Sequence, residues 1–271
     1  MGLGRRKAQI DSPEAWVFNK LVKEYAARPA YPTTVVDQVD AEVANVVRAR
    51  HSIDTQAFDP GKSGTIVDIG SGIGHFALPL ANRGHRVVAL EPAERMLEAL
   101  RKNATEAEAK NLITYHARAE ALPLADGTAD VALISDALHF IDVERTAAEV
   151  SRVLRPYGTL IVVVCRFGDT PFMGELQAVI ERHADRRFRH TDRALTQLFK
   201  LCGRGAVTQT RLSDHTALSP LRLMNILESF SFVGPAFSES RRAAFCADVA
   251  AISPSPVWSR SWRIFSGRGK H

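Results

Sequence analysis

The sequence predicts an α/β fold, a doubly wound, mostly parallel seven-stranded sheet with an N-terminal helical lid and a helical cap insertion. Two observations carry this prediction. From Thr65 onward, short apolar runs of strand length alternate with segments of helical periodicity, which is typical of a parallel sheet covered by helices on both faces. Immediately behind the first run stands a glycine-rich stretch, VDIGSGIGHF at 67–76, and such a turn between a strand and a helix is typical of nucleotide-binding sites.

Residues 1–64 are expected to form a helical lid and a linker. The spacing of apolar residues predicts a helix over 12–27, with Ser12 as its N-cap. The prolines of the stretch ARPAYP end that helix, because proline disfavours a helical residue before it. A second helix is expected over 33–50, with valines along one side, and the turn-rich residues 51–64 link it to the sheet.

Residues 65–165 are expected to form the core of the sheet, in which strands alternate with helices. The strands are predicted at 65–69, 86–90, 112–116, 130–135 and 159–165. Helices are predicted from about 73 to 83, from 93 to 104 and from 142 to 154, and Gly84 is expected to end the first of them. Right-handed crossovers would place the carboxyl ends of these strands at one edge, where ligands of such sheets bind.

Residues 166–271 are expected to form a helical cap together with the last strands of the sheet. The cap helices are predicted at 172–187, 192–202, 220–229 and 238–251. The last strands are predicted at 206–213 and 258–266.

Composition narrows the class of protein. Hydrophobic residues make up 45% and charged residues 24% of the chain, as in ordinary soluble globular proteins. No stretch approaches the roughly 20 apolar residues that cross a bilayer, and no apolar run follows the basic start, so we expect neither a membrane span nor a secretory signal. The three cysteines are too few and too scattered for a disulfide framework or a metal site. A cytoplasmic protein is expected.

The net positive charge belongs to the C-terminal part of the chain. Residues 1–165 hold 19 lysines and arginines against 21 acidic residues, whereas residues 166–271 hold 16 against 9. This excess either favours an anionic partner or only aids solubility.

The glycine-rich turn indicates which kind of ligand is bound. Gly70, Gly72 and Gly74 are spaced G-x-G-x-G, whereas a dinucleotide fingerprint has G-x-G-x-x-G. Asp68 before the turn would repel a pyrophosphate but suits an ammonium group, such as that of S-adenosylmethionine. Glu91, at the end of the second strand, can accept hydrogen bonds from both ribose hydroxyls.

Five stretches carry a resemblance to a known family: YAARPAYP, VDIGSGIG, ALEPAERML, ARAEALPLADGTADVALISDALHFID and EVSRVLRPYGTLIVV. The chain resembles the class I S-adenosylmethionine-dependent methyltransferases, in particular their type 11 branch, and its layout is similar to the trans-aconitate methyltransferase group. The resemblance implies a Rossmann-like core, S-adenosylmethionine as cofactor, and a small-molecule acceptor.

The resemblance also implies a set of cofactor contacts. The glycine turn would lie under the methionine end of the cofactor, and residues after the second and third expected strands would surround the ribose and adenine. The implied cofactor-binding residues are Tyr25, Arg28, Asp68, Gly70, Ser71, Gly72, Gly74, Glu91, Pro92, Met96, Ala119, Glu120 and Ser135. For Tyr25 and Met96 a packing role is the alternative, since each also suits an apolar helix face.

The sequence departs from the family pattern at two places. Arg118 stands where the family often has an acidic residue, which puts recognition of the adenine amino group in doubt. The usual proline-glycine-glycine turn is Pro156-Tyr157-Gly158 here, so we expect a type I turn with a left-handed conformation at Gly158.

His139 is the candidate catalytic residue. It follows the fourth expected strand, in SDALHFID, and should face the cleft near the transferred methyl group. It would remove a proton from the acceptor or orient it; packing or capping of the next helix is the alternative. Asp136 and Asp142 are expected to be a turn former and a helix N-cap.

The stretch RHADRRFRHTDR, at 182–193, could contribute an arginine stripe. Within one helix, arginines at 182, 186, 189 and 193 would line one side, with histidines 183 and 190 beside them, and could clamp an anionic acceptor. The alternative is a solvated face, because Thr191 is also a possible N-cap that would break the helix. Ser229 and Ser231 are further candidates for the acceptor pocket by the resemblance alone.

The sequence therefore favours a methyltransferase that acts on a small molecule, with a carboxylate or hydroxyl oxygen as acceptor. The basic C-terminal part motivates a nucleic-acid methyltransferase as an alternative, but no appended RNA-binding module accompanies it. A cofactor-binding biosynthetic protein that does not methylate, and an NAD-dependent oxidoreductase, are the other readings to be tested.

Overall fold

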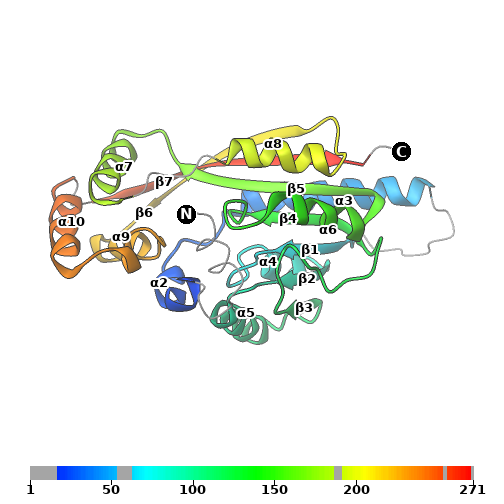
Figure 1. Cartoon of the computed structure of the whole chain (residues 1–271), viewed down its shortest axis with the longest axis horizontal. Helices are drawn as coiled ribbons and strands as arrows, with labels where there is room; N and C mark the ends of the chain where they lie inside the picture. The colour runs from blue at the N-terminus through cyan, green and yellow to red at the C-terminus, as the bar shows by residue number, and fades with distance from the viewer. Residues whose placement is uncertain (1–16, 54–62, 186–190, 253–254, 270–271) are drawn as a thin grey trace, which may run out of the picture. The chain divides into compact units, whose positions relative to one another are not determined.

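The computed structural model describes residues 17–53, 63–185, 191–252 and 255–269 (Figure 1). They form two compact units. Unit 1 comprises 1–30, 165–189 and 212–262, and unit 2 comprises 31–164, 190–211 and 263–271. The predicted domain boundaries after residues 64 and 165 stay a prediction.

One seven-stranded sheet has the strand order β3-β2-β1-β4-β5-β7-β6. The bounds of its strands are β1 Thr65–Ile69, β2 Arg86–Leu90, β3 Leu112–Tyr115, β4 Ala129–Ser135, β5 Leu154–Phe167, β6 Thr208–Ala217 and β7 Val257–Arg268. β1 pairs in parallel with β2 and β4, as do β2 with β3 and β4 with β5. The predicted doubly wound, mostly parallel α/β sheet is confirmed.

Within unit 2, the strands from β3 to β5 run in sheet order from the bottom of Figure 1 upward. From β1 the chain proceeds to β2 and β3 in one direction, and it then returns to the other side of β1 to form β4 and β5. The change of direction falls between β1 and β4, and in open α/β sheets ligands bind outside the carboxyl ends of the strands at such a switch point.

Helices cover this part of the sheet, with bounds α3 Thr33–Ile53, α4 Ala77–Asn82, α5 Glu94–Glu106, α6 Val143–Val153 and α8 Asp192–Leu201. α6 packs against α8 in a core cluster that includes Val67 and Ile69 of β1. α3 contacts β4 and α4, and the valines that the sequence placed on one side of it are buried, namely Val35, Val36, Val39, Val43, Val46 and Val47. Because strand side chains alternate, Asp68 faces away from the α6 side.

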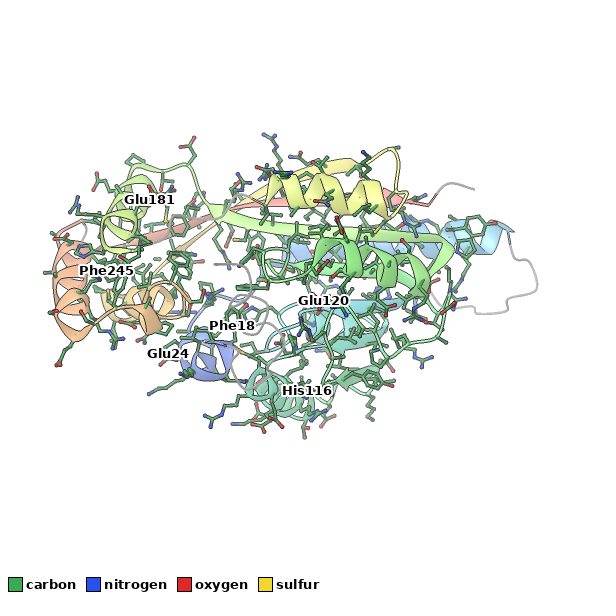
Figure 2. The ribbon with its side chains drawn as sticks, in the orientation of Figure 1. Phe18, Glu24, His116, Glu120, Glu181 and Phe245 are labelled. Atoms are coloured by element: carbon green, nitrogen blue, oxygen red, sulfur yellow. The ribbon has the colours of Figure 1, made fainter. Side chains whose placement is uncertain are left out.

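Unit 1 has its own core. Its helices are η2 Val17–Lys20, α2 Val22–Tyr25, α7 Pro171–His183, α9 Pro220–Glu228, η3 Gly234–Ala236 and α10 Glu239–Ile252. α7, α9 and α10 surround an apolar cluster that includes Met173, Ile226, Phe245 and Trp258. Glu181 of α7 and Phe245 of α10 are labelled in Figure 2. Among the described residues, no helix combines the length and apolarity needed to span a membrane.

The helix predicted over 12–27 is not continuous. Its first residues lie outside the described residues, and the described part forms a 3-10 helix, η2, and the single turn α2. Leu21 interrupts the helix with φ −113° and ψ 7°, and its side chain is buried. Helical spacing was present, but the break at Leu21 and the prolines behind Tyr25 limit each helical piece to four residues.

The expected left-handed conformation at Gly158 is wrong. Residues 156–158 lie within β5, and Gly158 is absent from the glycines of positive φ in the described chain. Ala129 of β4 pairs with Leu154 and Val131 pairs with Thr159, so the register shifts where the additional residues of β5 lie. Glycine is still required there, since a Cβ would lie 2.9 Å from Leu154 Cδ2.

Candidate active site

The glycine turn after β1 is held against the end of β2. The backbone N–H groups of Gly70 and Ser71 both donate to the carbonyl of Leu90, at 2.8 and 3.0 Å, and the Ser71 hydroxyl donates to the same oxygen at 3.3 Å. Gly70, Gly72 and Gly74 have φ values of +73°, +57° and +96°, which side chains disfavour. The turn therefore needs glycine at each alternate position, as its sequence spacing indicated.

The first and third glycines are also required for packing. A Cβ on Gly70 would lie 2.8 Å from the Cβ of Ala137, which follows β4. A Cβ on Gly74 would lie 2.4 Å from Cδ1 of Leu100, on α5. Gly70 thus lets the loops after β1 and β4 meet at the switch point, and Gly74 lets α5 pack against the turn.

Glu91, directly after β2, joins the turn to the start of α5. Its Oε2 accepts the N–H of Gly72 and its Oε1 accepts the N–H of Ala93, each at 2.8 Å. The side chain is only 6% exposed. Burial raises the pKa of Glu91 to about 7, although these two backbone N–H groups and the nearby His116 oppose the rise.

Asp68 lies in the middle of the site and is 2% exposed. Burial, and next the charge of Glu91, raise the pKa of Asp68 to about 7, against a hydrogen bond from the backbone of Ala77. The structure thus brings together the two carboxyls that the sequence singled out. Carboxyl groups that are buried beside each other are unusual outside functional sites, because each disfavours the ionised form of the other.

The residues implied at the adenine edge lie in the loop after β3. Ala119 is buried in the core cluster with β1 and α6. Glu120 Oε1 accepts the N–H of Asp142 at 2.8 Å, and its Oε2 pairs with the Nε of Arg118 at 3.3 Å. Arg118, the departure from the family pattern, therefore neutralises Glu120, and Figure 2 labels this glutamate. Asp142 is confirmed as the N-cap of α6, accepting the N–H groups of Glu144 and Arg145.

Pro92 and Met96 follow Glu91. The carbonyl of Pro92 accepts a hydrogen bond at 3.0 Å from Nε2 of His116, an exposed residue labelled in Figure 2. Met96 is 1% exposed, which favours the packing role that the sequence left open for it. Its contact with the cofactor stays a prediction, as does that of Pro92.

The loop after β4 carries the candidate catalytic histidine. Asp136 has φ +48°, which agrees with its expected role as a turn former, and its N–H donates to the carbonyl of Val163. The ring of His139 lies 3.9 Å from that of Phe140, and the side chain is half-buried. The loop thus begins at the switch point, and the catalytic role of His139 stays a prediction.

Ser135, the last residue of β4, has a partner that the sequence reasoning missed. Its hydroxyl forms a 3.0 Å hydrogen bond with the hydroxyl of Tyr31. The ring of Tyr31 lies 5.1 Å from that of His75 and 4.7 Å from that of Phe76, both directly after the glycine turn. A signal was present, since Tyr31 belongs to the stretch YAARPAYP, but nothing in the sequence distinguished it from Tyr25.

Tyr25 and Arg28 belong to unit 1, whereas the glycine turn belongs to unit 2. Within unit 1, Arg28 donates from Nε to Oγ of Ser229 at 2.7 Å and from Nη2 to its carbonyl at 3.1 Å. Its guanidinium lies 4.2 Å from the centre of the Tyr25 ring, which in turn contacts Phe18 edge to face. The roles of Tyr25 and Arg28 in cofactor binding stay predictions.

The arginine stripe at 182–193 does not form one helix. α7 ends at His183, α8 begins at Asp192, and residues 186–190 lie outside the described residues. Arg182 and His183 both pair with Asp248 of α10, at 2.9 and 2.8 Å. Thr191 occupies the N-cap position of α8 without a side-chain hydrogen bond. The break after His183 excludes the single-helix stripe, and the solvated face that the sequence offered as the alternative stays a prediction for the remaining arginines.

The carboxylates of the unit 2 site fit an adenosyl amino acid. Each oxygen of a carboxylate can accept about two hydrogen bonds, and each oxygen of Glu91 accepts one from the backbone. One acceptor position therefore stays on each oxygen for the two hydroxyls of a ribose. The nearby Asp68 supplies a negative field that suits an ammonium or sulfonium group and disfavours a pyrophosphate.

Comparisons with known proteins agree with this site. Residues 67–162 match the family described as a methyltransferase domain. An uncharacterised methyltransferase of Mycobacterium tuberculosis is 34% identical over 142 residues, which are 51% of this chain and 56% of that protein. An uncharacterised methyltransferase-like protein of Schizosaccharomyces pombe is 26% identical over 219 residues, 80% of this chain and 78% of that protein. The chain spans little more than half the length of the first of these relatives.

Solved structures show the same fold. A candidate type II methyltransferase of Anaeromyxobacter dehalogenans superposes with a TM-score of 0.59 at 20% identity, over 90% of this chain and 97% of that one. The YcgJ protein of Bacillus subtilis gives 0.54 at 16% identity, over 85% and 99%. These structures share the fold of this chain, and residues 67–162 match the methyltransferase domain.

Proposed function

We propose that the chain transfers a methyl group from S-adenosylmethionine to a small-molecule acceptor. The observation that carries the proposal is Glu91, a buried carboxylate that the glycine turn and the start of α5 hold by one backbone N–H on each oxygen. This arrangement leaves paired acceptor positions next to a turn that only glycine can form. The matched methyltransferase domain covers both Glu91 and the turn.

The protein's part in this reaction is to bind and align. When bound, the cofactor supplies a methyl group activated by a positively charged sulfur. Glu91 would accept the ribose hydroxyls, and the glycine turn with Asp68 would hold the amino-acid end. Ser71, Gly72, Pro92, Met96, Ala119, Glu120 and Ser135 complete the proposed contacts in unit 2. Alignment of acceptor and methyl carbon by such fixed groups supplies much of the rate in reactions of this kind.

For the acceptor we propose an oxygen of a small molecule, with a carboxylate as the leading class. A dimethylglycine N-methyltransferase of Parasynechococcus marenigrum is 33% identical over 138 residues, 50% of this chain and 49% of that protein. Its name supports a small acceptor but refers to nitrogen, so the choice of oxygen rests on the proposal alone. Arg182 is paired with Asp248, and residues 186–190 lie outside the described residues, so the stretch 182–193 carries no argument for a nucleic-acid acceptor.

Isothermal titration with S-adenosylhomocysteine and with NADH tests the cofactor class. We expect the first to bind and the second not to. Glu91→Gln should weaken S-adenosylhomocysteine by about 10-fold to 100-fold, because hydrogen bonds to a charged group contribute roughly 1.5–3 kcal/mol. Glu94→Gln, an exposed residue in the first turn of α5, is the matched control. Binding of NADH in preference, or equal affinity in Glu91→Gln and wild type, would refute the proposal.

A panel of acceptors with methyl-labelled cofactor tests the reaction. A carboxylate acceptor needs no base at pH 7, whereas a hydroxyl acceptor does. His139→Asn should therefore lower kcat by less than about 3-fold with a carboxylate acceptor, and by roughly 100-fold or more with a hydroxyl. Cofactor binding without transfer to any member of the panel would instead favour a biosynthetic protein that does not methylate.

A further inference from the structure

Tyr31 connects the two loops that form the switch point of the sheet. Its ring contacts His75 and Phe76, which follow the glycine turn of β1, and its hydroxyl bonds Ser135, the last residue of β4. The same two loops meet at Gly70 and Ala137. All of these residues belong to unit 2.

The backbone on either side fixes the position of this tyrosine. Pro32 follows it, which disfavours a helical conformation at Tyr31. The carbonyl of Pro32 accepts the N–H groups of Val35 and Val36, so the residue immediately precedes the first turn of α3. Both valines are buried against the sheet, at 0% and 3% exposed. Tyr31 is therefore anchored by a rigid helix, whereas its own side chain is only half-buried.

The hydroxyl pair is suited to a polar ligand group. A hydroxyl has one donor and two acceptor positions, and the 3.0 Å bond to Tyr31 uses only one position of Ser135. A serine hydroxyl otherwise rotates among staggered positions, and the bond to a fixed tyrosine selects among them. Ser135 is half-buried at the carboxyl end of β4, so a ligand at the switch point can reach it.

We propose that Tyr31 is a positioning residue for the amino-acid end of the bound cofactor, acting through Ser135. The inference rests on the proposed function, because it takes S-adenosylmethionine as the ligand. Ser135 ends β4 and Glu91 follows β2, and these two strands lie on opposite sides of β1, so the hydroxyl pair and the ribose carboxylate approach the glycine turn from opposite sides. The hydroxyl pair holds the α-amino or α-carboxylate group and takes no part in holding the nucleoside.

The test compares two ligands that differ only at that end. S-adenosylhomocysteine carries the amino-acid portion, whereas 5′-methylthioadenosine has the same adenosine and thioether without it. Tyr31→Phe keeps the ring contacts and removes the hydroxyl. By isothermal titration we expect it to weaken S-adenosylhomocysteine by about 10-fold and 5′-methylthioadenosine by less than about 2-fold. Unchanged affinity for the second ligand also shows that the variant is folded.

Four further variants test whether the loss is selective. Ser135→Ala should give the same selective loss, and the double variant Tyr31→Phe/Ser135→Ala should be no weaker than the stronger single one, as for two residues that act as a unit. Glu91→Gln should weaken both ligands, because both contain the ribose. Tyr157→Phe, which removes a hydroxyl from β5, should change neither.

The outcomes separate this inference from the proposed function. Wild-type binding of S-adenosylhomocysteine with an unchanged affinity in Tyr31→Phe would overturn the inference and leave the proposed function standing. An equal loss for both ligands in Tyr31→Phe would also overturn it, because it would mean a structural role. If the wild-type protein binds neither ligand, the proposed function falls, and the inference falls with it.

Discussion

The two edges of the unit 2 sheet hold buried carboxylates in opposite ways. At the edge where β1 and β4 begin, Asp130 is 1% exposed; it accepts the N–H of Thr65 and forms ion pairs with Arg50 and Arg155 at 3.0 and 3.2 Å. At the edge where β1 and β2 end, Asp68 and Glu91 are almost as deeply buried. In the part of the chain that the structure describes, backbone N–H groups bond these two, and neither pairs with a lysine or arginine.

A buried ionised group is costly unless it is paired, and the arginines offset that cost at Asp130. Among the described residues no lysine or arginine offsets it at Asp68 and Glu91, and burial raises the pKa values of both to about 7. Under the proposed function, Asp130 is a structural carboxylate, whereas Asp68 and Glu91 gain their partners when the cofactor binds. Four measurements can break or sharpen this comparison.

The largest effect is expected at the paired edge. Asp130→Asn removes the charge that Arg50 and Arg155 share, and should lower the free energy of unfolding by about 2–4 kcal/mol, since it leaves partly buried cations unpaired. Urea unfolding at pH 8 measures it. Asp126→Asn is the control, because Asp126 pairs with Arg152 at 2.8 Å but its side chain is 80% exposed, and we expect less than about 1 kcal/mol there. If Asp130→Asn left the free energy of unfolding unchanged, the contrast between the two edges would be removed.

At the unpaired edge, the same kind of substitution should stabilise. The pKa of Asp68 is raised from 3.8 to about 7 on folding, so the native state binds the proton more tightly. The contribution of Asp68 to stability is therefore greatest below pH 4 and falls as the pH rises to about 7. At pH 8 the free energy of unfolding of Asp68→Asn should exceed that of wild type by about 2–4 kcal/mol, with a smaller difference at pH 5, by urea unfolding.

The same variant should bind S-adenosylhomocysteine more weakly than wild type. A destabilised Asp68→Asn at pH 8, or one that binds the ligand as tightly as wild type does, would contradict the assignment of this carboxyl to a ligand.

The next largest effect is expected from a comparison of one glycine at each edge. Gly74 and Gly84 have φ values of +96° and +93°, but a Cβ on Gly74 meets Leu100 whereas a Cβ on Gly84 meets nothing within 4 Å. Gly84→Ala should cost only the backbone strain, about 1–2 kcal/mol, and Gly74→Ala about 1–3 kcal/mol more. Equal losses in thermal unfolding would show that α5 yields to the added methyl group, and that the turn needs glycine for its backbone alone.

The smallest effect is the pH dependence of binding. Glu91 must be ionised to accept two ribose hydroxyls, and its pKa is raised to about 7. Affinity for S-adenosylhomocysteine should therefore approach its full value above about pH 8 and fall by about 10-fold between pH 8 and pH 6, because the ionised fraction falls by about tenfold over that range. Titrations in Glu91→Gln should lack this component. A wild-type affinity that rises toward pH 6 would contradict it.

Much of the fold could be predicted because its signals are local. The strand positions followed from apolar runs, and the glycine turn from its spacing, since a positive φ at Gly70, Gly72 and Gly74 is a property of the residue type. Two predictions failed because apolar spacing and turn residues do not report the backbone path. The single helix over 12–27 was wrong because the backbone leaves the helical region at Leu21, and the turn at Gly158 was wrong because residues 154–167 form one strand whose register with β4 shifts at that point.

For the site, the sequence alone determined the residue types and their order along the chain: a carboxylate at 68, alternate glycines at 70, 72 and 74, and a carboxylate at 91. These features are properties of short stretches of sequence and do not depend on contacts with the rest of the chain. Only the tertiary structure decided that Glu91 is held by Gly72, that Arg118 neutralises Glu120, and that Tyr31 reaches Ser135 across 104 residues of chain. A hydrogen bond depends on which atoms folding brings within 3 Å, and sequence separation does not encode that distance.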